Sequence, residues 1–198
     1  MKRIVGSLVF AALITFVPAS ALAQDSTPSV DEPQGVPVEL CTIEPRSVES
    51  LQALIEQRPA DGTDVRIPIR FSPGEGEPAD VLTTDAVTAV MSELAACYNA
   101  GDLLRIYGLF TDDALIPALL PEDVAAVAVA TPLPITTGHQ YEEPKVWDVR
   151  VQVDGRVTAM VEFNGEIALI TFAWNGEQYL IDLFDDQIVG TATPVPGA

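Results

Sequence analysis

One carboxylate is a candidate for chemistry, because Asp182 interrupts an otherwise apolar run near the C-terminus. Alternate residues of a strand share a face, so Asp182 is expected to point away from Ile181 and Leu183. If its face lines a pocket, burial makes Asp182 a candidate general acid or base. The alternative is structural, with Asp182 facing solvent or pairing with an arginine such as Arg150 or Arg156.

Several aromatic and aliphatic side chains are candidates for lining a cavity that binds a small apolar ligand. They are Leu94, Tyr98, Tyr107, Phe110, Phe172 and Trp174. Such residues at helical or alternating spacing also form ordinary hydrophobic cores. Each of them therefore has a core interpretation beside the pocket interpretation.

Other reactive groups are sparse in the chain. The only histidine, His139, lies in a loop rich in Gly, Thr and Pro, and no nucleophile can be matched to it. Asp112 and Asp113 are predicted to end a helix and to contact backbone amides, since a metal there would need further ligands. The sequence shows no nucleotide-binding loop, zinc constellation or serine-hydrolase elbow. We therefore predict no metal and no cofactor.

The composition limits the partners of this chain. It has 198 residues and a formal net charge of −19, from 10 Lys and Arg against 29 Asp and Glu. Nucleic acids and anionic membranes require a basic face, so both are excluded as partners. Hydrophobic residues make up 48% of the chain, too many for a disordered acidic protein. This length suits one domain with tails.

The first 23 residues have the pattern of a secretory signal peptide. Lys2 and Arg3 form a basic start, residues 4–17 are uncharged, and Ala21-Leu22-Ala23 fits a cleavage site before Gln24. The apolar stretch is shorter than the roughly 20 residues that span a bilayer. We therefore expect a secreted or extracytoplasmic protein with no membrane contact after cleavage near Ala23 and Gln24.

The expected export bears on the oxidation state of the two cysteines, Cys41 and Cys97. Outside the reducing cytosol they can form one intramolecular disulfide. The bond would close a loop of about 56 residues and stabilise the fold by about 4 kcal/mol in the chain-entropy model. Two buried free thiols are the alternative. The absence of a Cys-x-x-Cys motif indicates a structural bond and not a redox centre.

Helical periodicity dominates the first half of the mature chain. A flexible leader, 24–39, is expected before an N-terminal extension, 40–78. The extension includes a short helix that starts after Pro45-Arg46-Ser47 and a possible strand at 65–71. Further helices are predicted from Thr84 to the Asn99-Ala100-Gly101 stop, after an Asp102 cap, and over 121–130.

From residue 145 onward the apolar period changes to two, which predicts strands. Four strands are separated by Asp154-Gly155, Asn164-Gly165 and Asn175-Gly176, dipeptides that type I′ hairpin turns prefer. In the first strand, Trp147, Val149, Val151 and Val153 are expected on the buried face. The sequence thus predicts an α+β protein with an antiparallel meander, followed by a disordered tail at 190–198.

Two segments of the sequence, one over the predicted helices and one over the predicted strands, carry a family resemblance. They are CYNAGDLLRIYGLFTDDALI (97–116) and DVRVQVDGRVTAMVEFNGEIALITFAWNGEQYLID (148–182). Residues 79–189 resemble the nuclear transport factor 2-like superfamily, in particular its SnoaL-like members. The resemblance implies a cone, a curved sheet wrapped by two to three helices around a pocket that opens at one end. Members include isomerases, hydratases, cyclases, ligand-binding proteins and dimerising modules.

The resemblance also argues against one kind of catalysis. Ketosteroid-isomerase-like members carry a tyrosine on the first helix and a general-base aspartate after the Asp-Asp-Ala element. Ungapped alignment places Leu94 and Ala118 at these positions. We therefore expect an exported, non-catalytic cone domain that binds a small apolar ligand. The alternatives are a homodimerising interaction module and an isomerase- or cyclase-like enzyme that uses Asp182.

Overall fold

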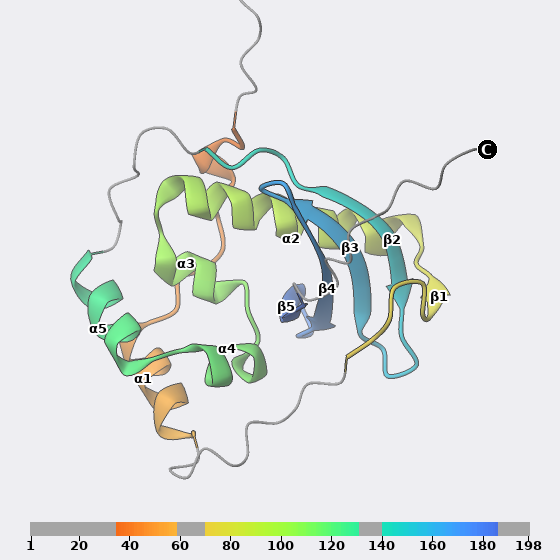
Figure 1. Cartoon of the computed structure of the whole chain (residues 1–198). Coiled ribbons are helices and arrows are strands. Elements are labelled where there is room, and N and C mark those ends of the chain that lie inside the picture. Colours follow the sequence, from red (N-terminus) through yellow and green to blue (C-terminus); the bar gives the residue numbers. More distant parts are fainter. Residues whose placement is uncertain (1–34, 59–69, 131–139, 186–198) are drawn as a thin grey trace, which may run out of the picture. The chain divides into compact units, whose positions relative to one another are not determined.

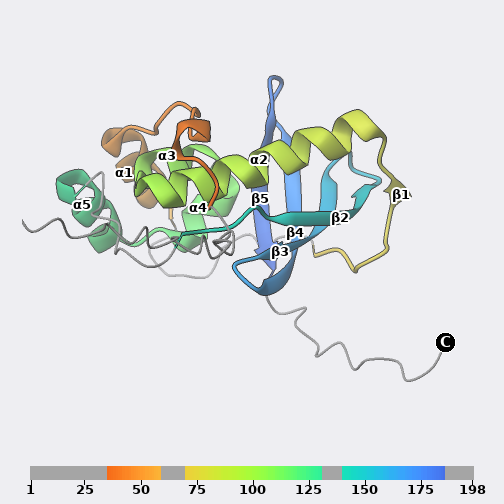
Figure 2. The ribbon, with the colours of Figure 1, turned by 90° about the horizontal axis from the view of Figure 1, so that it is seen from above.

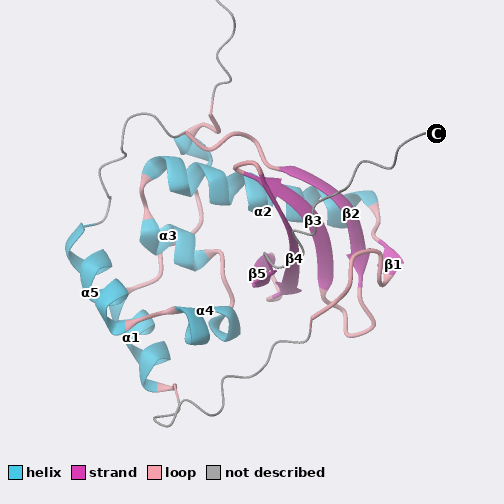
Figure 3. Cartoon of the chain, viewed as in Figure 1, coloured by secondary structure: helices cyan, strands magenta, loops and turns pink. Residues whose placement is uncertain are grey.

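The computed structural model describes residues 35–58, 70–130 and 140–185, all of which belong to one compact unit. The predicted signal peptide, most of the leader, His139 and the predicted tail lie outside the described residues, as does most of the possible strand at 65–71. Within the unit, helices pack beside one antiparallel sheet (Figure 3). The α+β class predicted from the sequence is confirmed.

The sheet has five strands whose spatial order follows their order in the chain. They are β1 (Glu77–Pro78), β2 (Lys145–Val151), β3 (Val157–Phe163), β4 (Glu166–Trp174) and β5 (Tyr179–Asp185). Every neighbouring pair is antiparallel, which confirms the four-stranded meander. The N-terminal extension adds the short edge strand β1, which the sequence did not predict.

The three hairpin turns differ in type. Asn164 and Gly165 both have positive φ, 52° and 80°, as a type I′ turn requires. In the turns at Asp154 and Asn175 only the following glycine has positive φ, so the type I′ prediction is wrong there. In both, the side chain instead accepts a hydrogen bond from a backbone N–H two residues on, which favours a different local turn.

A β-bulge in β2 changes which of its residues face the core. Asp148 has a φ of 49°, and the pairing with β3 shifts between Trp147 and Arg150. The extra residue breaks the strict alternation, so Val149 is buried while Trp147 is 40% exposed. The prediction that Trp147 faces the core is therefore wrong. It is also wrong for Val153, which lies in the exposed hairpin turn.

The helix α2 (Val81–Ala100) lies against one face of the sheet (Figures 1 and 2). It begins three residues earlier than predicted, because the Asp80 side chain caps it by accepting a hydrogen bond from Thr83 N at 2.7 Å. It ends at Gly101, whose φ of 66° suits a glycine. Asp102 then caps α3 (Leu103–Gly108), as predicted.

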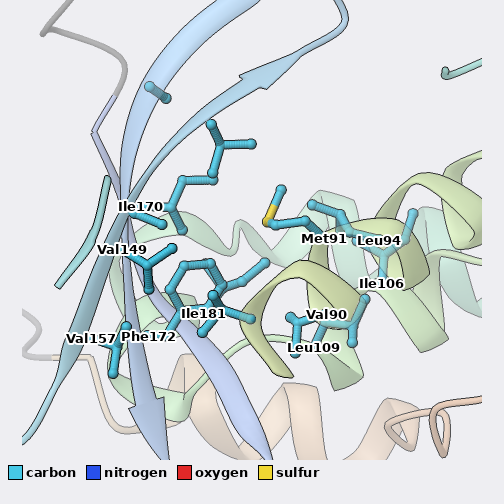
Figure 4. Close-up of a cluster of buried hydrophobic side chains, with 14 of the residues drawn as sticks. Val90, Met91, Leu94, Ile106, Leu109, Val149, Val157, Ile170, Phe172 and Ile181 are labelled. Atoms are coloured by element: carbon cyan, nitrogen blue, oxygen red, sulfur yellow. The ribbon is translucent and has the colours of Figure 1, made fainter. Parts of the chain in front are cut away.

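The main core lies between α2 and the sheet. Met91 and Leu94 of α2 face Ile170, Phe172 and Ile181 of the strands (Figure 4), and all five side chains are at most 1% exposed. Burial of this apolar surface is the main force that holds helix and sheet together. The core thus fixes the position of α2 and β5, on which the site described below depends.

A second core joins the N-terminal extension to the helices that follow α3. The extension forms a 3₁₀ turn (Val38–Leu40) and α1 (Val48–Glu56), which Ser47 caps as predicted. Beside α1 lie α4 (Asp112–Ala118) and α5 (Pro121–Ala130) (Figure 1). The residues that share this core are Leu51, Leu54, Leu115, Leu119 and Val124. The described residues thus hold five α-helices, of which α4 is the one that the sequence did not predict.

The helix α4 corrects one prediction. Asp112 and Asp113 were expected to end a helix, but they form the first turn of α4 after the Thr111 cap. Two carboxylates in a first turn interact favourably with the helix dipole, which explains their position.

A disulfide ties the extension to α2. Cys41 and Cys97 are bonded, with a Cα–Cα distance of 4.8 Å, which confirms the predicted pairing. Nearby, the Glu93 side chain accepts hydrogen bonds from Thr42 N at 2.7 Å and from Ile43 N. The extension is therefore fixed to the C-terminal half of α2 by a covalent bond and by polar contacts.

Candidate functional site: a pocket between α3, α4 and β5

A cavity of about 800 Å³ lies where α3 and α4 approach the end of the sheet. Its wall is largely apolar. The lining residues are Tyr98, Ile106, Tyr107, Phe110, Asp113, Ala114, Leu115, Pro117, Ala118, Asp154, Arg156, Ala173, Asp182, Leu183 and Phe184. A pocket of this size, with an apolar wall and a few polar groups, is typical of small-molecule sites.

The structure brings some of the predicted ligand-binding residues to this cavity and not others. Tyr98, Tyr107 and Phe110 line it. Leu94 and Phe172 are buried in the main core at 1% and 0% exposure and do not reach the wall. Trp174, in β4, is 54% exposed and contacts the ring of Tyr179. For these last three residues the pocket interpretation is replaced by core or surface packing.

Asp182 also lines the cavity, as part of a hydrogen-bonded group. Its Oδ2 lies 3.0 Å from Nη1 of Arg156, and the Thr111 hydroxyl donates to its Oδ1 at 2.9 Å. The side chains of Arg156 and Asp182 are only 18% and 14% exposed. The structural alternative for Asp182, pairing with Arg156, is therefore the arrangement observed.

A second β-bulge places Asp182. Its neighbours Ile181 and Leu183 oppose Phe172 and Thr171, which are consecutive in β4, so Asp182 has no partner across the strands. Ile181 and Leu183 therefore face opposite sides of the sheet, although strict alternation predicts one common face. Bulges re-aim side chains in this way and often occur next to functional sites.

Thr111 links the start of α4 to β5. Its backbone N–H donates to Ile181 O at 2.9 Å, and Ile181 N donates to Leu109 O at 2.8 Å, so residues 109–111 run along the edge of β5. The Thr111 hydroxyl accepts from Ala114 N at 3.1 Å and donates to Asp182. One side chain therefore caps the helix and orients the carboxylate of the pocket.

Arg156 sits between two carboxylates. Its Nε and Nη2 lie 2.9 Å and 2.8 Å from Oδ2 of Asp154, and its guanidinium carbon lies 4.8 Å from the centre of the Phe71 ring. Burial opposes the charged form, but the hydrogen bonds to Asp154 and Asp182 outweigh it and raise the pKa of Arg156. The side-chain hydrogen bond from Arg156 also lowers the pKa of Asp154.

We expect the Asp154 carboxyl to titrate below the ordinary aspartate range and to return toward it in the Arg156→Met variant. A depressed folded-state pKa stabilises the fold at pH values above the unfolded pKa. This contribution disappears as the pH falls through the folded pKa. Carboxyl ¹³C chemical shifts followed by NMR between about pH 2 and 6 measure the effect. An unchanged Asp154 midpoint in the variant would contradict it.

Two arginines of the N-terminal extension hold the wall formed by α3 and α4. Arg46 donates from Nε to Tyr107 O at 3.0 Å and from Nη2 to Phe110 O at 2.7 Å, and Nη1 contacts Asp112. Arg58 Nε donates to Ile116 O at 3.0 Å, near the end of α4. The sequence analysis did not identify either arginine as part of the site. The small number of basic residues in this acidic chain was a signal that could have pointed to them.

The two lining tyrosines are weaker acids than a tyrosine in water. Burial raises the pKa of Tyr98, with smaller effects of Tyr141 and Tyr107. Burial also raises the pKa of Tyr107, and the Asp123 carboxylate adds to the effect. Both phenols are therefore neutral at physiological pH and offer an aromatic surface together with a hydroxyl.

No family model, curated protein or solved structure matches the chain significantly. Within residues 35–58, 70–130 and 140–185, no group of three or more His, Cys, Asp or Glu side chains could hold a metal ion. Among the described helices, none is both long and apolar enough to cross a bilayer.

Proposed function

We propose that this protein is an exported, non-catalytic, cone-shaped domain of the nuclear transport factor 2-like type that binds a small apolar ligand. The order of elements supports the fold type: the helices α2 and α3 are followed by α4, which Thr111 caps, and the antiparallel meander of β2 to β5 comes later in the chain. The observation that carries the function is the cavity of about 800 Å³, whose wall is mainly aromatic and aliphatic.

Two features favour binding without catalysis. Asp182 is paired with Arg156 through Oδ2 and accepts from the Thr111 hydroxyl at Oδ1, so its contacts are those of a carboxylate with a structural role. The resemblance places the family's general base at Ala118, which lines the cavity but carries no group that can accept a proton. The isomerase-like alternative therefore has less support than the binding function.

Export is supported by two independent features of the chain. Residues 1–23 have the signal-peptide pattern. The disulfide between Cys41 and Cys97 is of the structural kind that persists in oxidising compartments and is rare in the cytosol.

Filling the cavity is expected to abolish ligand binding. As a probe we choose 4-phenylbutanol, a neutral apolar molecule small enough for the site. It is expected to bind the protein exported to an oxidising compartment of the host with a Kd on the order of 0.1 mM. The substitution Ala118→Trp places an indole at the wall and is expected to weaken binding at least about tenfold, measured by isothermal titration calorimetry.

The matched control is Ala53→Trp, which adds the same indole to an exposed position of α1 away from the cavity. It is expected to bind the probe as the parent protein does. Equal binding by the parent and Ala118→Trp proteins would exclude the pocket. Absence of binding, together with a mass that rises with protein concentration, would favour the homodimerising alternative.

A further inference from the structure

Tyr98, which lines the cavity from the end of α2, belongs to a cluster of three aromatic rings. The centre of its ring lies 4.8 Å from that of Tyr141, and the two rings are stacked at an angle of 26°. The ring of Phe163, in β3, lies 5.0 Å from Tyr141 and 5.9 Å from Tyr98. Tyr141 and Phe163 are not part of the cavity wall. Tyr98 therefore contacts the cavity and also two rings that lie behind the wall.

The residue that follows Tyr98 in the chain holds the backbone of Tyr141. Asn99 is buried, and its Oδ1 accepts a hydrogen bond from Tyr141 N at 2.7 Å. Its Nδ2 donates to Tyr141 O at 3.0 Å and to Val36 O at 2.8 Å. A buried amide side chain requires partners for both its oxygen and its nitrogen, and Asn99 finds them on backbone far away in the sequence. Neighbouring residues of α2 thus contact the ring and the backbone of the same tyrosine.

A small core fixes Tyr141 against α2 a second time. Val36 N donates to Tyr141 O at 2.9 Å, beside the hydrogen bond from Asn99. Val36 also shares a core with Ala95 and Ala96 of α2. The partly buried side chain of Tyr141 packs against this core. Backbone hydrogen bonds and side-chain packing therefore act together to hold the Tyr141 ring in one place.

We propose that Tyr141 and Asn99 are positioning residues of the pocket, which keep the ring of Tyr98 ordered at the cavity wall before the ligand arrives. Asn99 holds the backbone of Tyr141, and the stacked ring of Tyr141 restricts the ring of Tyr98. A side chain that is already ordered loses less conformational freedom when a ligand binds, and this raises the affinity. Stacked aromatic pairs are favourable by themselves, so the order is kept in the empty pocket. This inference rests on the proposed binding function of the same pocket.

Loss of the Tyr141 ring is expected to weaken the binding of 4-phenylbutanol about fivefold. Tyr141→Leu removes the stacked ring and keeps an apolar side chain in its place, whereas Tyr141→Phe keeps the ring and is expected to bind as the parent protein does. The matched control is Tyr179→Leu, which removes a ring that contacts Trp174 and does not line the cavity. It is expected to leave the affinity unchanged. Titrations followed by ¹H–¹⁵N NMR measure the affinities, and the same spectra show whether each variant is folded.

A double-mutant cycle tests whether Tyr141 acts through Tyr98. Tyr98→Leu removes the positioned ring and is expected to weaken binding by itself. In this background Tyr141→Leu is expected to cause no further loss, because no ring is left to position. Asn99→Ala is expected to follow the same pattern, and Tyr141→Met replaces the Leu variant if that variant does not fold. Equal losses with and without the Tyr98 ring would mean a general structural role and would overturn the inference.

The remaining outcomes separate this inference from the proposed function. If Ala118→Trp removes binding of 4-phenylbutanol while Tyr141→Leu binds it as tightly as the parent protein, the pocket stands and the positioning role is wrong. The positioning role is also wrong if Tyr141→Phe or Tyr179→Leu loses as much affinity as Tyr141→Leu. If the parent protein shows no binding that Ala118→Trp removes, the pocket itself is wrong, and the positioning role is overturned with it.

Discussion

Replacing Cys41 and Cys97 together with alanine is expected to lower the free energy of unfolding by about 4 kcal/mol. The two cysteines are 56 residues apart, and the bond between them restricts the unfolded chain over that whole loop. Cys97 is also fully buried, so alanine is preferred to serine, which would add the cost of burying a hydroxyl.

Urea unfolding followed by circular dichroism measures the difference. The parent protein under reducing conditions serves as the matched control, because it keeps both side chains and loses only the bond. It is expected to unfold at nearly the same urea concentration as the double variant. A loss below about 1 kcal/mol would mean that the contacts of Glu93 and Arg46 constrain the extension without the disulfide.

The same variant is expected to bind 4-phenylbutanol more weakly. The extension that the disulfide fixes to α2 continues into Arg46, which holds the backbone of Tyr107 and Phe110 at the cavity wall. The bond therefore acts on the site through the position of the extension and not through a direct contact.

Local signals in the sequence predicted much of the fold. Helix stops and caps such as Gly101 and Asp102 act within a few residues, and the structure has them where they were expected. Asn164 and Gly165 form the predicted turn because both can adopt positive φ at little cost. The period-two pattern likewise located four strands, since one face of each must be buried against the helices.

The errors arose where distant parts of the chain decide the local structure. Because of the bulges at Asp148 and Asp182, Trp147 and Leu183 face the side of the sheet opposite to the one predicted. No local sequence pattern indicates that a strand contains an extra, unpaired residue. The cavity could not be located from spacing, because its wall joins α3 and α4 to strands about 40 to 80 residues later in the chain. The pairing of Asp182 with Thr111 depends on the same long-range arrangement.

Replacing Phe172 with alanine is expected to lower the free energy of unfolding by about 3–5 kcal/mol. The ring is fully buried between Val157 and Ile181, its partners in the neighbouring strands, and faces α2 across the main core. Its removal loses the transfer free energy of a large side chain and leaves a cavity that the surrounding strands cannot fill.

Trp174, two residues further along β4, is the matched control. It is about half exposed and its described ring contact is with Tyr179, so Trp174→Ala is expected to cost about 1 kcal/mol or less. Guanidinium unfolding at pH 7 measures both variants. Phe172→Leu, which keeps most of the volume, provides an intermediate value if the alanine variant does not fold.

The comparison also tests whether Phe172 belongs to the core or to the ligand site. A wall residue can be shortened at small cost in stability, and the enlarged cavity would then change the affinity for 4-phenylbutanol directly. A core residue gives the opposite pattern, because its loss destabilises the fold while a folded Leu variant keeps the parent affinity. A small loss of stability with a large change in affinity would mean that Phe172 belongs to the ligand site. It would also mean that the cavity reaches into the space between α2 and the sheet.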